Sequence, residues 1–114
     1  MSDGTGDELA LVLTTAPSRT AAEALAGQLV EERRIACANL VPGVGSVYRW
    51  EGATRHEEEV LVVMKTVASE VERLFDRIAE LHPYDVPELI AVPVAAASQA
   101  YCRWVRQETI EVSE

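Results

Sequence analysis

The chain has 114 residues, 48% of them hydrophobic, with 5 prolines and 6 glycines, a composition typical of one globular domain. Its 10 basic and 19 acidic residues give a formal net charge of -9, the wrong sign for neutralising the phosphates of a nucleic acid. Its apolar runs are far shorter than the roughly 20 residues that a membrane-spanning helix needs. We therefore expect neither a nucleic-acid partner nor a membrane partner.

The start of the chain is acidic and lacks the basic and apolar segments of a signal peptide, which favours a cytoplasmic location. Cys37 and Cys102 are far apart in the sequence and are expected to be reduced thiols. We assign residues 1–8 to a disordered or loosely ordered tail, residues 9–110 to a single domain and residues 111–114 to a second tail.

A strand and a helix are predicted first. Residues 9–15 form a continuous apolar run with threonines, which is typical of a covered strand. A helix follows, capped by Ser18 or by a capping box from Thr20 to Glu23, and it ends near Arg34. Its apolar side chains recur at helical spacing: Ala22, Leu25, Ala26, Leu29 and Val30.

A long β-hairpin is predicted next. Its first strand begins at Ile35, is interrupted around Gly43 and Gly45, and resumes over residues 46–50. The chain then reverses, and residues 59–66 form the second strand of the hairpin, with a continuous apolar centre.

The rest of the chain predicts a helix, a strand and a further helix. Residues 71–81 have the strongest helical pattern, and a capping box from Ser69 to Glu72 precedes it. Residues 89–94 form a short strand that ends or bends at a proline. Residues 98–108 form the last helix, with aromatic side chains on one face.

This order, β-α-β-β-α-β with an appended helix, predicts an α+β, ferredoxin-like fold with two helices on one face of an antiparallel sheet. The strand over residues 59–66 is apolar on both of its sides, so the second face of the sheet also needs a cover. In a chain this short, the expected cover is another copy of the chain. We therefore predict a homo-oligomer.

Three stretches of the sequence resemble the CutA family of divalent-cation tolerance proteins. They are residues 36–52 (ACANLVPGVGSVYRWEG), residues 59–66 (EVLVVMKT) and residues 82–88 (HPYDVPE). The resemblance runs from about Leu11 to about Thr109. It implies a ferredoxin-like protomer that assembles into a homotrimer, similar in architecture to the PII signalling proteins.

The resemblance also implies a link to divalent metal ions, chiefly copper, and no established catalytic reaction, so we predict a protein that is not an enzyme. Two positions depart from the pattern of the family. Ala53-Thr54 stands in the hairpin turn where the family often has a lysine, and Ala97-Ser98 stands where a Gly-Asn pair is common. These departures concern local loop contacts and not the fold.

Cys37 and His82 are the candidate metal ligands. A thiolate suits Cu(I), and an imidazole suits Cu(II) or Zn(II). The two residues lie 45 positions apart without a C-x-x-C motif, so no strong preformed metal site is predicted. Packing of Cys37 in a strand is favoured over a ligand role, and a copper or other divalent ion would be weakly bound. His82 can also have a purely structural role, because it ends a helix before Pro83, where an imidazole interacts favourably with the helix dipole.

A ligand-binding cleft is the second candidate site, since Pro83 and Pro87 stiffen the segment between a helix and a strand. Its predicted residues are Trp50, Glu59, Lys65, Tyr84 and Glu88. Lys65 closes an apolar strand, so its ammonium must reach water or a carboxylate. The candidate carboxylates are Glu59, Asp85 and Glu88. The predicted aromatic residues of the subunit interface are Tyr48, Trp50 and Trp104.

Three functions are compatible with these residues. The first is a metal-responsive trimer that binds copper or another divalent cation. The second is a PII-like sensor or scaffold that holds a small anionic ligand or a partner protein in its inter-subunit clefts. The third, a hydrolase of the acylphosphatase kind, is disfavoured: it needs an arginine in the loop after the first strand, where this chain has Thr15-Ala16-Pro17, and a positioned asparagine, of which Asn39 is the only one available.

Overall fold

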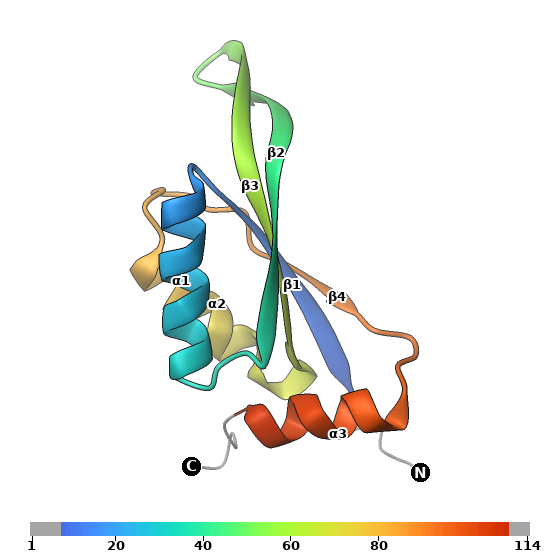
Figure 1. Ribbon diagram of the computed structural model, residues 1–114. Helices are drawn as coiled ribbons and strands as arrows, with labels where there is room; N and C mark the ends of the chain where they lie inside the picture. Colours follow the sequence, from blue (N-terminus) through green and yellow to red (C-terminus); the bar gives the residue numbers. More distant parts are fainter. Residues whose placement is uncertain (1–7, 110–114) are drawn as a thin grey trace.

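A four-stranded antiparallel sheet with two helices on one face organises the chain (Figure 1). The computed structural model describes residues 8–109, so the predicted tails, apart from Glu8, lie outside the described residues. The elements are β1 (Leu9–Ala16), α1 (Arg19–Glu31), β2 (Cys37–Trp50), β3 (Ala53–Val67), the 3-10 turn η2 (Ala68–Glu70), α2 (Val71–Leu81), β4 (Ile90–Pro93) and α3 (Gln99–Glu108). The strand order β2-β3-β1-β4 confirms the predicted ferredoxin-like fold with an additional helix.

The β2–β3 hairpin is longer and more continuous than the sequence predicted. The glycine-containing interruption is a β-bulge between Val41 and Val44, which Gly43 accommodates with a φ of 72°. Strand β3 begins at Ala53 rather than at residue 59, because the chain reverses in a tight turn at Glu51 and Gly52. Both turn residues have positive φ, 51° and 78°, as a two-residue hairpin turn requires.

The outer part of this hairpin, residues 44–59, is called the arm below, and within residues 8–109 no other strand lies beside it. Strand β1 pairs with β3 only as far as Ala16 opposite Val60. Beyond that point β2 and β3 pair with each other alone, and Figure 1 shows the arm projecting away from the helices and the rest of the sheet.

The cap predicted at Ser18 is confirmed, the one predicted for α2 is wrong, and the structure adds a cap at the start of α3. Ser18 accepts a hydrogen bond from the Ala21 amide at 3.1 Å at the start of α1, and Ser98 accepts one from the Tyr101 amide at 3.1 Å at the start of α3. The capping box predicted from Ser69 does not form. Residues 68–70 turn as η2 instead, and the residue at the N-cap of α2 makes no side-chain cap bond.

The main core lies between the helices and one face of the sheet. Its fully buried side chains come from α1, α2, β1 and β3, and the main ones are Val12, Leu29, Val62, Met64, Leu74 and Ile78. A smaller cluster forms where α3 crosses one end of the sheet, with Val105 packed against Leu9 and Ala36. These clusters explain why even-numbered positions are buried in β1 and, from Val60 onward, in β3.

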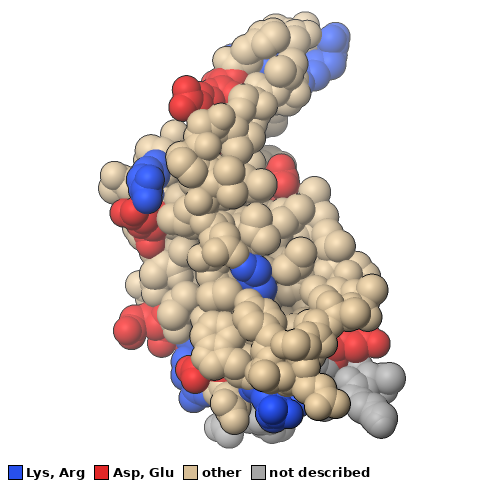
Figure 2. Space-filling model, turned by 45° about the vertical axis from the view of Figure 1, so that its right-hand side comes forward, with Lys and Arg blue, Asp and Glu red and all other residues tan. Residues whose placement is uncertain are grey.

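The opposite side of the sheet, here called the open face, is apolar and only partly covered. Its side chains alternate with those of the core: Leu11, Leu13, Thr15, Cys37, Asn39, Val41, Leu61, Val63, Lys65, Ile90 and Val92. All are half-buried or exposed, and Ile90 remains 48% exposed. Figure 2, turned toward this side, shows a broad surface over the body of the molecule with few charged side chains. The prediction that β3 is apolar on both sides is therefore confirmed.

An ion-pair network joins the end of α1 to α2. The Glu32 carboxylate accepts hydrogen bonds from Arg77 Nη2 at 2.6 Å, from Gln28 Nε2 at 2.7 Å and from Arg34 Nε at 3.0 Å. These donors, Arg77 above all, lower the pKa of Glu32 to about 2. Glu70 behaves oppositely, because its burial raises its pKa although Arg34 lies 3.5 Å away.

The Glu32 network is expected to make the free energy of unfolding depend on pH. Because the folded-state pKa of Glu32 is lowered from 4.5 to about 2, its stabilisation is complete above pH 4.5 and is lost as the pH falls to about 2. We expect Glu32→Gln to lower the free energy of unfolding at pH 7 by on the order of 1 kcal/mol, since solvent reaches the pair. Urea unfolding at pH 7, 4 and 2 measures this, with the exposed neighbour substitution Glu31→Gln as control. An equal deficit at pH 7 and pH 2 would contradict the assignment.

Candidate metal and ligand sites

His82 is a buried side chain with both ring nitrogens engaged. It follows the last residue of α2 and is 7% exposed. Its Nδ1 accepts a hydrogen bond from the Tyr84 amide at 3.1 Å, so the proton of the neutral ring lies on Nε2, which donates to the Thr15 carbonyl at 2.8 Å. The ring thus joins the segment after α2 to the end of β1. A metal ion could bind His82 only if one of these hydrogen bonds opened.

Glu59 and Tyr84 form a second buried contact beside His82. The Tyr84 hydroxyl donates to Glu59 Oε2 at 2.6 Å, and Glu59 is 8% exposed. Burial first, and then this carboxylate, raise the pKa of Tyr84. Further out on the arm, the Glu57 carboxylate likewise raises the pKa of Tyr48. Because the Glu59 carboxylate brings negative charge to the contact with Tyr84, this place does not favour an anionic ligand.

Cys37 lies at the start of β2, on the open face and beside α3. Its Sγ atom is 3.4 Å from the Tyr101 hydroxyl, and this contact raises the pKa of Tyr101 to about 12. The Tyr101 ring in turn lies 5.6 Å from the ring of Trp104, centroid to centroid. Cys37 is half-buried as a free thiol, so it is neither a fully packed core residue nor an exposed one.

Cys37 and His82 do not meet within one copy of the chain. Cys37 stands opposite Lys65, which stands opposite Leu11, whereas His82 binds Thr15. Four positions along β1 correspond to about 13 Å, too far for one metal ion to bind both side chains. Across residues 8–109, no group of three or more His, Cys, Asp or Glu side chains is placed to hold a metal ion. The residues therefore do not form a resident metal centre in one chain, and their role as ligands stays a prediction.

Lys65 has a partner that the sequence analysis did not name. Its Nζ atom donates to Asn39 Oδ1 across the β2–β3 pair. Glu59 is six positions away on the same strand, about 20 Å, and is bound by Tyr84. Glu88 is exposed in the connection to β4, as is Asp85. Within one chain none of the three candidate carboxylates contacts Lys65, and its half-buried side chain keeps access to water, the other predicted environment.

The predicted cleft residues are spread along the molecule. Trp50 lies at the tip of the arm, Glu59 and Tyr84 at its base, and Lys65 in the middle of the open face. Within one chain only Glu59 and Tyr84 contact each other. The aromatic residues predicted for an interface are exposed, by 38% for Tyr48, 47% for Trp50 and 39% for Trp104. Their interface role stays a prediction.

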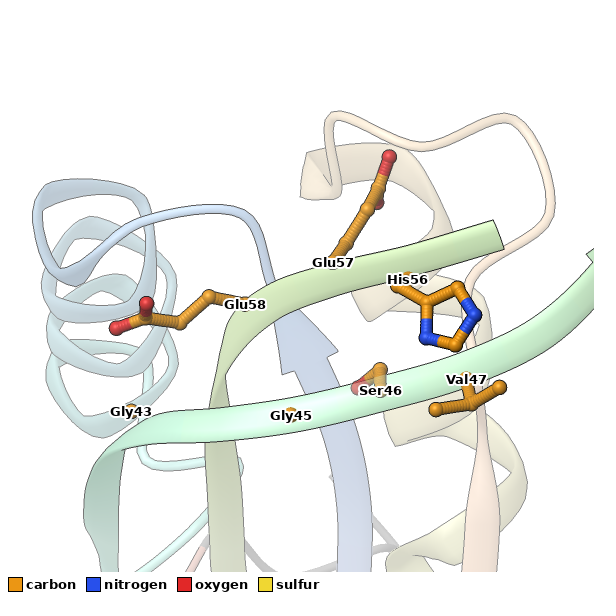
Figure 3. A pocket seen from close by; sticks show the side chains of 7 residues that line it. All are labelled: Gly43, Gly45, Ser46, Val47, His56, Glu57 and Glu58. Atoms are coloured by element: carbon orange, nitrogen blue, oxygen red, sulfur yellow. The ribbon is translucent and has the colours of Figure 1, made fainter. Parts of the chain in front are cut away.

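A shallow hollow of about 420 Å³ lies on the arm, next to the bulge. Its lining residues are Gly43, Gly45, Ser46, Val47, His56, Glu57 and Glu58. Figure 3 shows that Glu57 and Glu58 leave β3 in different directions and that the His56 ring lies apart from both carboxylates. Because these side chains do not converge on one point, the hollow is a surface depression rather than a built metal site.

Three residues that the sequence did not assign to a site are part of these arrangements. Thr15 supplies the carbonyl for His82, Asn39 supplies the oxygen for Lys65, and Tyr101 contacts the thiol of Cys37. Asn39 carried a signal, since it is the only asparagine of the chain and lies in an apolar strand. The other two depend on contacts between distant segments.

Comparison with known proteins places the chain in a defined group. Residues 10–108 match the family described as CutA1 divalent ion tolerance protein. The "Divalent-cation tolerance protein CutA" of Thermus thermophilus is 43% identical over 99 residues, which cover 87% of this chain and 96% of that protein. The crystal structure of CutA1 from Oryza sativa superposes with a TM-score of 0.90 at 37% identity, covering 95% of this chain and 99% of that one. The Thermus thermophilus structure gives 0.85 at 42% identity, over 89% and 98%.

None of the helices in the described part of the chain combines the length and the apolar character that crossing a membrane requires.

Proposed function

Because the chain belongs to the CutA1 divalent ion tolerance family, we propose that it acts in tolerance of divalent cations as a cytoplasmic homotrimer without enzymatic activity. The observation that carries the proposal is the match over residues 10–108. The relatives' names describe a tolerance role, and the fold of this chain is theirs.

The open face supports self-association. It presents leucine, isoleucine and valine side chains from all four strands, and the arm adds Val47 and Trp50, which are exposed. Burying such surface against another copy lowers the free energy by about 25 cal/mol for each Å² of apolar area removed from water. The unpaired edges of β2 and β4 would gain partners in the same way. A second copy therefore satisfies both needs with one interaction.

The proposed metal contact is weak and exchangeable. In this proposal Cys37 supplies a soft thiolate for copper in each copy, and His82 joins it only if its hydrogen bond to Thr15 or to the Tyr84 amide opens. A thiol on the open face beside Tyr101 can be reached before assembly or at a subunit boundary, unlike a thiol inside the main core. The ion is a ligand that the protein responds to, and not a permanent part of its fold.

Titration with copper tests this assignment. We expect Cys37→Ser to weaken Cu(I) binding at least tenfold under reducing conditions, because the only soft ligand of the site is removed. His82→Ala is expected to lower the free energy of unfolding by about 1–3 kcal/mol, because the Thr15 carbonyl and the Tyr84 amide lose their partner. Competition with a Cu(I) chelator measures the affinity, and urea unfolding measures the stability.

Cys102→Ser is the matched control, since Cys102 is also a half-buried free thiol but lies on α3. Equal Cu(I) affinities for the parent, Cys37→Ser and Cys102→Ser would rule out the thiol site. A tenfold loss of Cu(II) affinity in His82→Ala alone would move the proposed ligand to the imidazole.

One observation supports the PII-like alternative, in which an anionic ligand or partner protein is held between subunits. Lys65 is a cation on the open face, and the other predicted cleft residues could approach it only from another copy. Extraction of small molecules that co-purify with the protein distinguishes the alternative from the metal proposal.

A further inference from the structure

A small polar group interrupts the open face and is called the polar island below. It consists of Cys37, Asn39, Lys65 and Tyr101. Lys65 Nζ donates to Asn39 Oδ1, and Cys37 Sγ contacts the Tyr101 hydroxyl at 3.4 Å. Cys37 stands directly opposite Lys65 in the β2–β3 pair, so the two contacts lie side by side. The apolar side chains of the open face surround them.

Lys65 is the only lysine of the chain and the only charged member of the open face. Its ammonium has three donor hydrogens, and Asn39 accepts one of them. In a single copy, water reaches the half-buried side chain and satisfies the others. When another copy covers the face, this water is lost, and an ammonium left without acceptors costs several kcal/mol.

This cost differs between ways of packing the same surfaces together. Apolar side chains attract one another without direction, so they favour many registers of one open face on another to a similar degree. A register that places leucine or valine over Lys65 leaves the ammonium without acceptors. A register that places carbonyl, hydroxyl or carboxylate oxygens over it does not. The polar island therefore destabilises most ways of packing two open faces together and leaves only a few without this cost.

We propose that the polar island selects the register and the number of copies in the assembly, while the apolar residues around it provide the affinity. The occupant of the open face is a second copy of this chain, so the inference rests on the proposed self-association. Asn39 is a positioning residue in this scheme, because it holds the ammonium of Lys65 toward the edge of the sheet formed by β2. A single buried polar residue in an apolar interface can determine oligomeric state in this way.

A double-mutant cycle on Lys65 and Asn39 tests the proposal. We expect Lys65→Met to lower the apparent dissociation constant about tenfold or more, because the cost of burying the ammonium disappears, and to yield at least two stoichiometries. Asn39→Leu is expected to raise the dissociation constant about tenfold or more, because the ammonium loses its acceptor. The double variant should again associate tightly and again be mixed. Sedimentation velocity over a dilution series and native mass spectrometry provide the two readouts.

Arg19→Met is the matched control, because it also removes one positive charge but lies at the exposed start of α1, on the other side of the sheet. It should keep the affinity and the single stoichiometry of the parent. Circular dichroism identifies variants that fail to fold, and Lys65→Gln, which keeps polarity without charge, then replaces Lys65→Met with the same expected direction.

The possible results separate the two proposals. If the parent is a monomer at micromolar concentration, self-association fails and the selection role fails with it. If the parent is oligomeric and Lys65→Met keeps one unchanged stoichiometry, the selection role alone is overturned. Effects of equal sign from Lys65→Met and Asn39→Leu would also overturn it, because a change in apolar packing, and not an unpaired charge, would explain both.

Discussion

Replacing Leu13 by aspartate is expected to convert the protein into monomers. Leu13 lies near the centre of the open face, opposite Val63 on β3 and Ile90 on β4. A carboxylate at this position would have to lose its water for another copy to bind, at a cost of several kcal/mol. In the isolated chain the same carboxylate stays in contact with water, because Leu13 is only half-buried on the open face, and the fold is expected to survive. Sedimentation equilibrium measures the mass in solution.

Ala24→Asp is the control for this substitution, since Ala24 is an exposed residue of α1 and the change adds the same charge on the helical side. It should leave the assembly unchanged. Unchanged far-ultraviolet circular dichroism confirms that the Leu13→Asp chain has folded. An assembly that persists in folded Leu13→Asp would show that copies do not meet through the open face.

The second large effect is expected from Ile78→Ala in α2. Ile78 is fully buried in the main core, where it packs with residues of β1 and β3. Removing three carbon atoms leaves a cavity that the sheet and α1 can close only in part. We expect the free energy of unfolding to fall by about 2–5 kcal/mol. Urea unfolding of parent and variant at one fixed protein concentration measures the difference, because assembly makes stability depend on concentration.

Val86→Ala provides the comparison, since Val86 is 73% exposed in the segment before β4. Its effect should stay within about 0.5 kcal/mol. If the two substitutions cost the same, the main core would not lie between the helices and the sheet as described.

The spacing of apolar residues predicted most of the fold, because an element that is buried on one side must repeat its apolar residues with the period of a helix or a strand. The apolar spacing over residues 71–81 predicted α2, and the structure has that helix over the same residues. The failed cap at Ser69 has a local cause: the chain forms η2 before the helix begins, and a 3-10 turn does not present the amides that a capping box satisfies. A match of residue types does not reveal such a turn.

The candidate sites were harder to predict, because they depend on strand register. Counting inward from the turn at Glu51 and Gly52 pairs Cys37 with Thr66, which faces the main core. The bulge shifts the register by one position, so that Cys37 stands opposite Lys65 on the open face. The partnership between Lys65 and Asn39 has the same origin. The sequence indicated a bulge or bend near Gly43. It did not show which residues of β3 would stand opposite Cys37 and Asn39 as a result.

The arm is a part of the molecule whose length can change without disturbing the rest. From Val44 and Glu59 to the turn, its two strands pair only with each other, so removing residues there breaks no pairing with β1. Side chains alternate between two sides along a strand, so loss or gain of two residues in each strand keeps every side chain of the arm on its own side. A change of one residue in each strand reverses the side chains between that point and the turn. Related chains can therefore differ in reach by steps of about 7 Å while sharing one core.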